Sequence, residues 1–193
     1  QGRSERLPVL PNRFDMVVSG LTAAALASWV AGPAYPGAGV LLIGAGGLQL
    51  VRLMRWEGLR AFDDPLVFVL HLSYAWLPAG LILLGCAALF SLLPVTSAVH
   101  ALGAGAMGAM TLAVMTRATR GHTGRVLEAD RATLHIYILV HAGALLRVLA
   151  PLLPFDYMGI IAAAGGLWAS AFLLFLLVYV PMAVRPAPGE KSA

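Results

Sequence analysis

Long apolar stretches, separated by short polar segments, run through almost the whole chain. Six of them are close to the roughly 20 apolar residues that a helix needs to cross the hydrocarbon core of a bilayer. The six stretches cover residues 16–32, 36–54, 65–93, 96–116, 133–150 and 158–184. This pattern predicts an all-α fold, a polytopic integral membrane bundle of about six transmembrane helices.

The connections between the stretches predict how consecutive helices are joined. Only residues 32–35 separate the first two stretches, which makes these a tight helical hairpin. The third stretch is long enough to tilt in the bilayer, and Pro78 is expected to kink it at mid-depth.

The amino-acid composition supports a membrane protein. Hydrophobic residues make up 60% of the chain and charged residues 11%, whereas roughly 25% of an average soluble domain is charged. The mean hydropathy is +0.84. Cys86 is the only cysteine, which excludes an intrachain disulfide.

Basic residues fall almost entirely on one side of the predicted topology. With successive stretches crossing in alternating directions, twelve of the thirteen Lys and Arg residues share one side, and Arg147 is the exception. Because insertion leaves Lys and Arg on the cytoplasmic face, we expect both termini to be cytoplasmic. Residues 1–15 are then a cytoplasmic linker without the pattern of a signal peptide, 16–184 the transmembrane domain, and 185–193 a cytoplasmic tail.

The same topology explains the basic character of the chain. A net charge of +4 and a pI near 9.7 would suit a nucleic-acid partner. Placed on the membrane topology, however, the basic residues are accounted for by orientation alone. The sequence therefore predicts membrane lipid as a partner and no nucleic acid.

Four histidines lie inside the apolar stretches, where an ionisable side chain usually faces the bundle interior and marks a site. They are His71, His100, His135 and His141. From a helical rise of about 1.5 Å per residue, His71 and His135 are expected near the cytoplasmic end. His100 is expected near the outer end, at the level of Arg147. The predicted pairs are therefore His71 with His135 and His100 with Arg147, and a hydrogen bond to a neighbouring helix is the alternative role for each histidine.

The fourth stretch combines a histidine and methionines with many small residues. At about 100° per residue, His100 and Met107 share one face with Ala104, flanked by Gly103. A gap of small residues on that face leaves room for a flat macrocycle or for a second helix. Close helix packing by the small residues, and core filling by methionine, are the alternative interpretations.

Arginines surround His122 where the fourth stretch ends. Residues 117–125 predict a basic loop punctuated by glycines. Its guanidinium groups, including that of Arg125, suit an anionic group such as a carboxylate or a haem propionate, and a simple turn is the alternative. Arg147 either binds such a group or snorkels to the interface and pairs with Asp156.

Several segments of the chain together resemble one family. They are residues 70–80 (HLxYxWxPxG), 100–102 (HAL), 110–125 (MTLAVMTRATRGHTGR) and 144–151 (ALLRVLAP). In this combination they resemble the NnrS family of bacterial membrane proteins, and the resemblance runs from about residue 52 to residue 184.

The resemblance implies a protein of about twelve helices, of which this chain is similar to the C-terminal six. The N-terminal half of the same protein is then a partner. The resemblance also implies haem and copper as cofactors and nitric oxide as a small-molecule ligand. It places the protein in the inner membrane of denitrifying and related bacteria, in the response to nitric oxide and nitrosative stress.

On the same resemblance, His71 and His100 are the candidate metal ligands. The other candidate cofactor-binding residues are Met107, His122, Arg125 and Arg147. Half of a secondary transporter, with buried His and Arg side chains that handle protons or an anion, is the alternative function.

Overall fold

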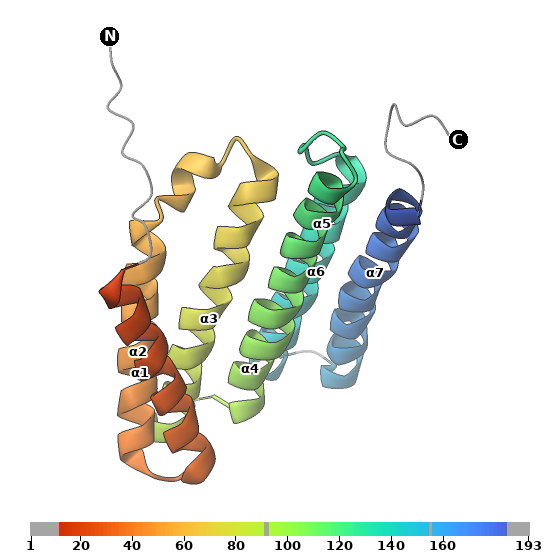
Figure 1. Ribbon diagram of the computed structural model, residues 1–193. Coiled ribbons are helices and arrows are strands. Elements are labelled where there is room, and N and C mark those ends of the chain that lie inside the picture. Colours follow the sequence, from red (N-terminus) through yellow and green to blue (C-terminus); the bar gives the residue numbers. More distant parts are fainter. Residues whose placement is uncertain (1–11, 91–92, 155, 185–193) are drawn as a thin grey trace, which may run out of the picture.

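The computed structural model describes residues 12–90, 93–154 and 156–184, and all regular structure in these ranges is helical (Figure 1). Its α-helices are α1 (Arg13–Ala31), α2 (Pro36–Arg55), α3 (Pro65–Phe90), α4 (Val95–His100), α5 (Met110–His122), α6 (Arg131–Leu149) and α7 (Tyr157–Val184). The π-helix η2 (Ala101–Ala109) joins α4 to α5, and the short 3-10 helices η1 (Gly58–Ala61) and η3 (Ala150–Leu152) follow α2 and α6.

Six helical segments of the described chain are long and apolar enough to cross a membrane. The fourth span is the continuous run of α4, η2 and α5, Val95–His122, and the fifth includes η3 at its end. One segment corresponds to each predicted stretch, so the prediction of an all-α bundle with six spans is confirmed. Helix α3 continues through Pro78. Most of the predicted linker, residues 1–11, and the predicted tail, 185–193, lie outside the described residues.

Helix α1 begins at Arg13, three residues before the predicted start. The Asn12 side-chain oxygen accepts a hydrogen bond of 2.9 Å from the Phe14 N–H, and the Asp15 carboxylate accepts one of 2.9 Å from the Asn12 N–H. This reciprocal capping satisfies amide groups that the start of a helix leaves unpaired. The helix therefore extends into the polar segment that precedes the apolar stretch.

The fourth span is also longer than predicted. Residues 117–122 form the last turns of α5, and residues 123–130 form the loop to α6. The prediction of a loop over residues 117–122 was wrong, because the polar side chain of Arg120 is buried and paired inside the bundle instead of being solvated. Gly124, with φ of 63°, takes the left-handed conformation in the loop that follows.

The spans form two groups that meet at the fourth span. Helix α2 packs along α3 with α1 beside α2, and α6 packs along α7. The fourth span lies between α3 and α6 and contacts both (Figure 1). Two apolar cores hold the spans together. One is centred on Leu42, Leu81 and Leu84 and reaches α4, and the other is centred on Ile136 and Phe175 and reaches α3.

One end of the bundle carries nearly all the described basic residues, and we call it the basic end. Helices α1, α3 and α6 begin there and α2, α5 and α7 end there, at the top of Figure 1. Arg147 is the one described basic residue near the opposite end. The one-sided charge distribution expected from the sequence is therefore present in the fold.

The π-helix η2 accommodates two tryptophan rings at its glycines. A Cβ on Gly105 would lie 2.5 Å from Cδ2 of Trp76 of α3, and a Cβ on Gly108 would lie 2.9 Å from Cζ2 of Trp168 of α7. Trp168 also donates a hydrogen bond of 3.2 Å from Nε1 to the Ala104 carbonyl. These glycines thus admit aromatic rings from the helices on either side of the fourth span.

The π-helix also changes which residues of the fourth span share a face. Its i→i+5 hydrogen bonds wind the chain through fewer degrees per residue than an α-helix does. The structure places His100 and Met107 in two separate pockets. The prediction that these two residues share a face with a gap between them was wrong.

Candidate functional site

His71 lies in α3, less than two turns from the basic end. Its Nδ1 is 3.0 Å from the Val67 carbonyl oxygen, one turn earlier. A carbonyl oxygen only accepts, so Nδ1 carries the proton and Nε2 keeps its lone pair. This is the protonation state in which a histidine binds a metal while the backbone holds its ring in place.

A pocket of about 570 Å³ surrounds His71. It is lined by Leu53, Met54, Glu57, Gly58, Arg60, Phe68, His71, Leu72 and Ala75. The imidazole lies edge-on to the Trp56 ring, with 6.2 Å between the centroids. A Cβ on Gly58 would lie 2.5 Å from the imidazole, so glycine is what allows the backbone to approach the ring. Glu57 and Arg60 pair at 2.7 Å and supply the charges of an otherwise apolar pocket.

His100 and Arg147 line one pocket near the opposite end of the bundle, as the depth of each along its helix predicts. The pocket measures about 380 Å³, and Gly103, Ala104, Gly143, Ala164, Gly165 and Trp168 complete it. Its lining contains an imidazole and a guanidinium but no acidic side chain. It is therefore suited to an anionic group.

The alternative pairing of Arg147 with Asp156 is not present. The Asp156 carboxylate accepts hydrogen bonds from the backbone N–H groups of Met158 and Gly159, at 3.1 and 3.0 Å, and so caps α7. Within residues 12–90, 93–154 and 156–184, no ion pair joins Asp156 to Arg147. The guanidinium of Arg147 is thus left for the pocket that it shares with His100.

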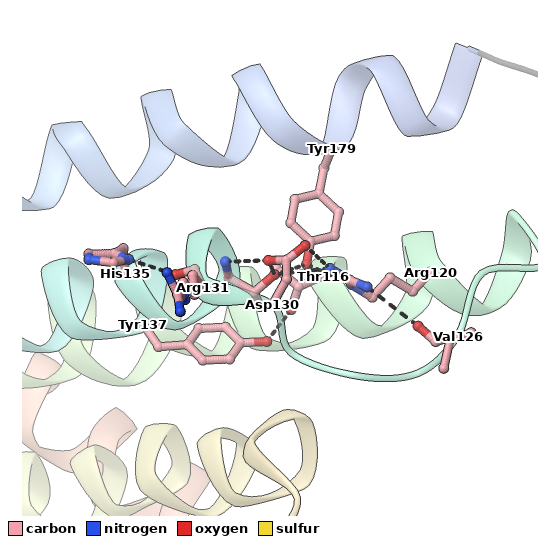
Figure 2. A network of polar contacts seen from close by, with 9 residues as sticks. Thr116, Arg120, Val126, Asp130, Arg131, His135, Tyr137 and Tyr179 are labelled. Carbon is pink, nitrogen blue, oxygen red and sulfur yellow. Dashed lines mark hydrogen bonds and ion pairs between the residues drawn. The ribbon is translucent and has the colours of Figure 1, made fainter.

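The predicted pair of His71 and His135 was wrong. His135 is exposed on α6, and its Nδ1 lies 2.6 Å from the Arg131 carbonyl oxygen (Figure 2). The two histidines do not line a common pocket, because His135 is exposed on the outside of α6 whereas His71 faces Trp56 in its own pocket. Equal depth in the membrane does not bring two side chains together when they lie on different faces of the bundle.

His71 and His100 belong to opposite ends of the bundle. At about 1.5 Å per residue their depths differ by on the order of 20 Å, so they cannot bind the same metal ion. In the part of the chain that the structure describes, no group of three or more His, Cys, Asp or Glu side chains could hold a metal ion.

The remaining candidates are spread over other surfaces. Met107 is 72% exposed and lines a pocket of about 590 Å³ with Met110 and Met115 among its neighbours. His122 is exposed at the end of α5, beside a shallow pocket of about 330 Å³. Arg125 is half-buried, and its Nη1 has no hydrogen-bond partner among the described residues.

Arg120 is the centre of a buried network that the sequence analysis missed (Figure 2). Its Nη2 pairs with Asp130 Oδ2 at 2.5 Å, and its Nε donates to the Tyr179 hydroxyl at 3.1 Å. Thr133 Oγ1 lies 2.6 Å from that hydroxyl and donates to Asp130 Oδ1 at 2.8 Å. The network joins α5, α6 and α7, so Arg120 is engaged within the fold and is not available to an anionic ligand.

Asp130 is the N-cap of α6, immediately outside the membrane span. Burial disfavours its charged form, but hydrogen bonds from the Thr133 amide and hydroxyl and from the Arg120 guanidinium outweigh that cost. The pKa of the Asp130 carboxyl therefore lies below its ordinary value. An aspartate directly before an apolar stretch is a helix N-cap signal, and this signal would have placed Asp130 at the start of α6.

A second network at the basic end joins α1, α2 and α3. Arg52 Nε pairs with Asp15 Oδ1 at 2.9 Å, and Arg52 Nη1 donates to the Tyr74 hydroxyl at 3.2 Å. The Tyr74 hydroxyl donates to the Gln49 amide oxygen, and Gln49 Nε2 donates to Thr22 Oγ1 at 2.8 Å. Each group of helices is thus tied together by one arginine, one aspartate and one tyrosine.

His141 of α6 has the opposite hydrogen bonding from His71. Trp76 Nε1 donates to His141 Nδ1 at 3.0 Å. The indole ring packs against Gly105 of the fourth span, where the missing side chain leaves room for it. Since Nδ1 accepts, the proton of the neutral imidazole is on Nε2. Nε2 is buried and has no hydrogen-bond partner among the described residues.

These features define a class: a multi-pass helical membrane protein with histidines and arginines in pockets at both ends of a six-span bundle. The sequence model described as NnrS protein matches residues 4–187, which is nearly the whole chain. The chain belongs to the NnrS family. Neither the curated proteins nor the solved structures include a match to it.

Proposed function

We propose that this chain is the part of an NnrS-family protein that binds haem, with copper as a second metal, and that it acts in the response to nitric oxide and nitrosative stress. Membership of the family over residues 4–187 supports the proposal. The observation that carries it is His71, whose Nδ1 is bonded to the backbone and whose Nε2 lone pair is free for a metal.

The residues around His71 fit a haem group. Imidazole is a common axial ligand of haem iron, and the pocket of about 570 Å³ offers apolar side chains for a macrocycle. Gly58 keeps the backbone close to the imidazole and holds the ring in place. Arg60, in the same pocket, pairs with Glu57 through Nη1 but is largely exposed, so its other N–H groups would be available to a carboxylate. The iron would supply a binding site for nitric oxide.

His100 is proposed as a ligand of a second metal centre, because it is too far from His71 to share one. Arg147 lines the same pocket and would hold an anionic group there. In this proposal Met107, His122 and Arg125 contribute to cofactor binding together with the N-terminal half of the protein, since none of them lines the pocket of His71 or of His100.

The proposed location is the bacterial inner membrane, with the basic end in the cytoplasm. The described basic residues other than Arg147 all lie at that end, as the positive-inside rule requires of a cytoplasmic face. The His71 pocket would then lie on the cytoplasmic side and the pocket of His100 and Arg147 on the outer side.

Absorption spectra of the detergent-purified, full-length protein test the proposal. We expect a haem Soret band that shifts on addition of nitric oxide, and His71→Ala should remove most of it because the axial ligand is lost. His100→Ala should lower the content of the second metal, measured by elemental analysis. His135→Ala is the control, since that side chain is exposed, and it should change neither signal. A haem content unchanged by His71→Ala would refute the assignment of His71.

Half of a secondary transporter is the second candidate function. The pocket of His100 and Arg147 favours this function. It combines an imidazole and a guanidinium with no acidic side chain, and it therefore suits a transported anion. A colourless protein from haem-replete cells, with anion uptake that is lost in Arg147→Ala, would establish this function in place of the first.

A further inference from the structure

We propose that the pocket beside Trp76 and His141 binds an uncharged, lipid-soluble carbonyl compound of the quinone class, held by a hydrogen bond from His141 Nε2. The pocket lies between α3 and α6 and measures about 380 Å³. Its lining includes Leu72, Ala75, Trp76, Ala79, His141 and Leu145. The proposal does not depend on haem binding at His71.

The hydrogen bond from Trp76 determines what His141 can bind. An indole N–H is only a donor, so His141 Nδ1 must be the accepting nitrogen in the 3.0 Å contact. The imidazole proton then lies on Nε2, which has no lone pair to offer to a metal. A partner of Nε2 must therefore be a hydrogen-bond acceptor.

The described protein supplies no such acceptor. His141 Nε2 is buried without a hydrogen-bond partner, and in the hydrocarbon layer there is no bulk water to replace one. An unpaired N–H is destabilising in that environment. A carbonyl oxygen brought by a ligand would satisfy it.

The lining of the pocket indicates an uncharged ligand. Apart from Trp76 and His141 the pocket is lined by apolar side chains, and no charged side chain is among them. An ionic ligand would be left without a counter-charge at this depth, which is costly. A neutral carbonyl group needs only the one donor that His141 offers.

The pocket is accessible from the lipid side. Leu72 and Leu145 line it and are 41% and 50% exposed on the outside of the bundle. Nε2 is buried, so a ligand oxygen reaches it when these two surface side chains change rotamer. Leu72 and Ala75 also line the pocket of His71, so the two pockets adjoin along α3.

Equilibrium binding of decylubiquinone to the full-length protein in detergent tests the proposal. We expect saturable binding that weakens about tenfold in His141→Phe, which keeps a flat ring and removes the donor. His135→Phe is the matched control on the same helix, and it should bind like the unsubstituted protein because His135 is exposed. Equal affinity of His141→Phe and the unsubstituted protein would overturn the proposal.

A second ligand keeps the test decisive if a variant fails to fold. Decylbenzene has a ring and the same tail but no carbonyl oxygen, so the unsubstituted protein should bind it at least tenfold more weakly than the quinone. Similar affinity for the two ligands would show that no hydrogen bond is made and would overturn the proposal. The haem spectrum is recorded on the same samples. Loss of haem in His141→Phe would instead make His141 a metal ligand and would also overturn the proposal.

Discussion

His71 and His141 show how one hydrogen bond decides what a histidine can do. The Val67 carbonyl accepts from Nδ1 of His71, whereas the Trp76 indole donates to Nδ1 of His141. The first contact leaves a lone pair on Nε2 and the second leaves a proton there. Two residues of the same type, in the third and fifth spans, are thereby suited to different partners, His71 to a metal and His141 to a hydrogen-bond acceptor.

Asp130 makes the stability of the bundle depend on pH. Its pKa is lowered in the folded protein, so the stabilisation that it contributes is complete above the carboxyl pKa of the unfolded chain, about 4. That stabilisation is lost as the pH falls through the lower pKa of the folded state. Asp130→Asn should therefore lower the unfolding temperature by a few degrees at pH 7 and should flatten its decline in acid.

Thermal unfolding followed by circular dichroism, in detergent and at a series of pH values, measures this effect. Asp63→Asn is the control, because Asp63 is exposed and makes no hydrogen bond or ion pair within the described residues. If both variants kept the pH profile of the unsubstituted protein, the ion pair with Arg120 would make no contribution to stability.

At the scale of the element, the packing of the π-helix η2 against Trp76 requires a glycine at position 105. A Cβ there would lie 2.5 Å from the Trp76 ring, and the ring cannot move without giving up its hydrogen bond to His141. Gly105→Ala should destabilise the protein by about 1–3 kcal/mol, the usual cost of overpacking. Chemical unfolding in mixed micelles measures the free energy.

Gly103 provides the matched control within the same helix. A Cβ at this position meets no atom within 4 Å, so Gly103→Ala should leave the free energy of unfolding unchanged or raise it slightly through helix propensity. Equal destabilisation by both substitutions would mean that replacing either glycine disturbs the π-helix, and that contact with Trp76 is not the cause.

The helices themselves could be predicted from apolar stretches, but their ends and their winding could not. The start of α1 depends on capping by Asn12 and Asp15, and the end of α5 depends on the pairing of Arg120 with Asp130 and Tyr179. Both are contacts of polar side chains. In a hydropathy pattern such side chains only mark the end of an apolar stretch, and their contacts are not represented. The π-helix contacts tryptophans on two other spans, which the sequence of the fourth span alone does not show.

On the scale of the whole molecule, the charge distribution predicts orientation. We expect the loop at residues 123–130 and the C-terminus to face the cytoplasm, because the basic residues gather at that end. With Cys86 replaced by serine, the substitution Thr123→Cys should be labelled by a membrane-impermeant maleimide only after cells are opened. Asp156→Cys, at the opposite end, should be labelled in intact cells. The reverse pattern would invert the topology.

The depth of each candidate site residue in the bundle could be predicted from the sequence, but the side chains that it contacts could not. Counting along the helices correctly placed His100 beside Arg147, because α4, η2 and α6 are neighbours. The same counting paired His71 with His135, but His71 lines a pocket whereas His135 is exposed on α6. Depth follows from one helix alone, whereas contact depends on the order in which all six spans pack.

The hydrogen bond between Trp76 and His141 has a consequence for the molecule as a unit. Among the described residues it is the only hydrogen bond between α1–α3 and the other spans, and both apolar cores cross the same boundary. Apart from this bond, apolar packing joins α1–α3 to the other spans, and each side has its own arginine network. A ligand at His141 would therefore sit against the one polar link between the two sides of the molecule.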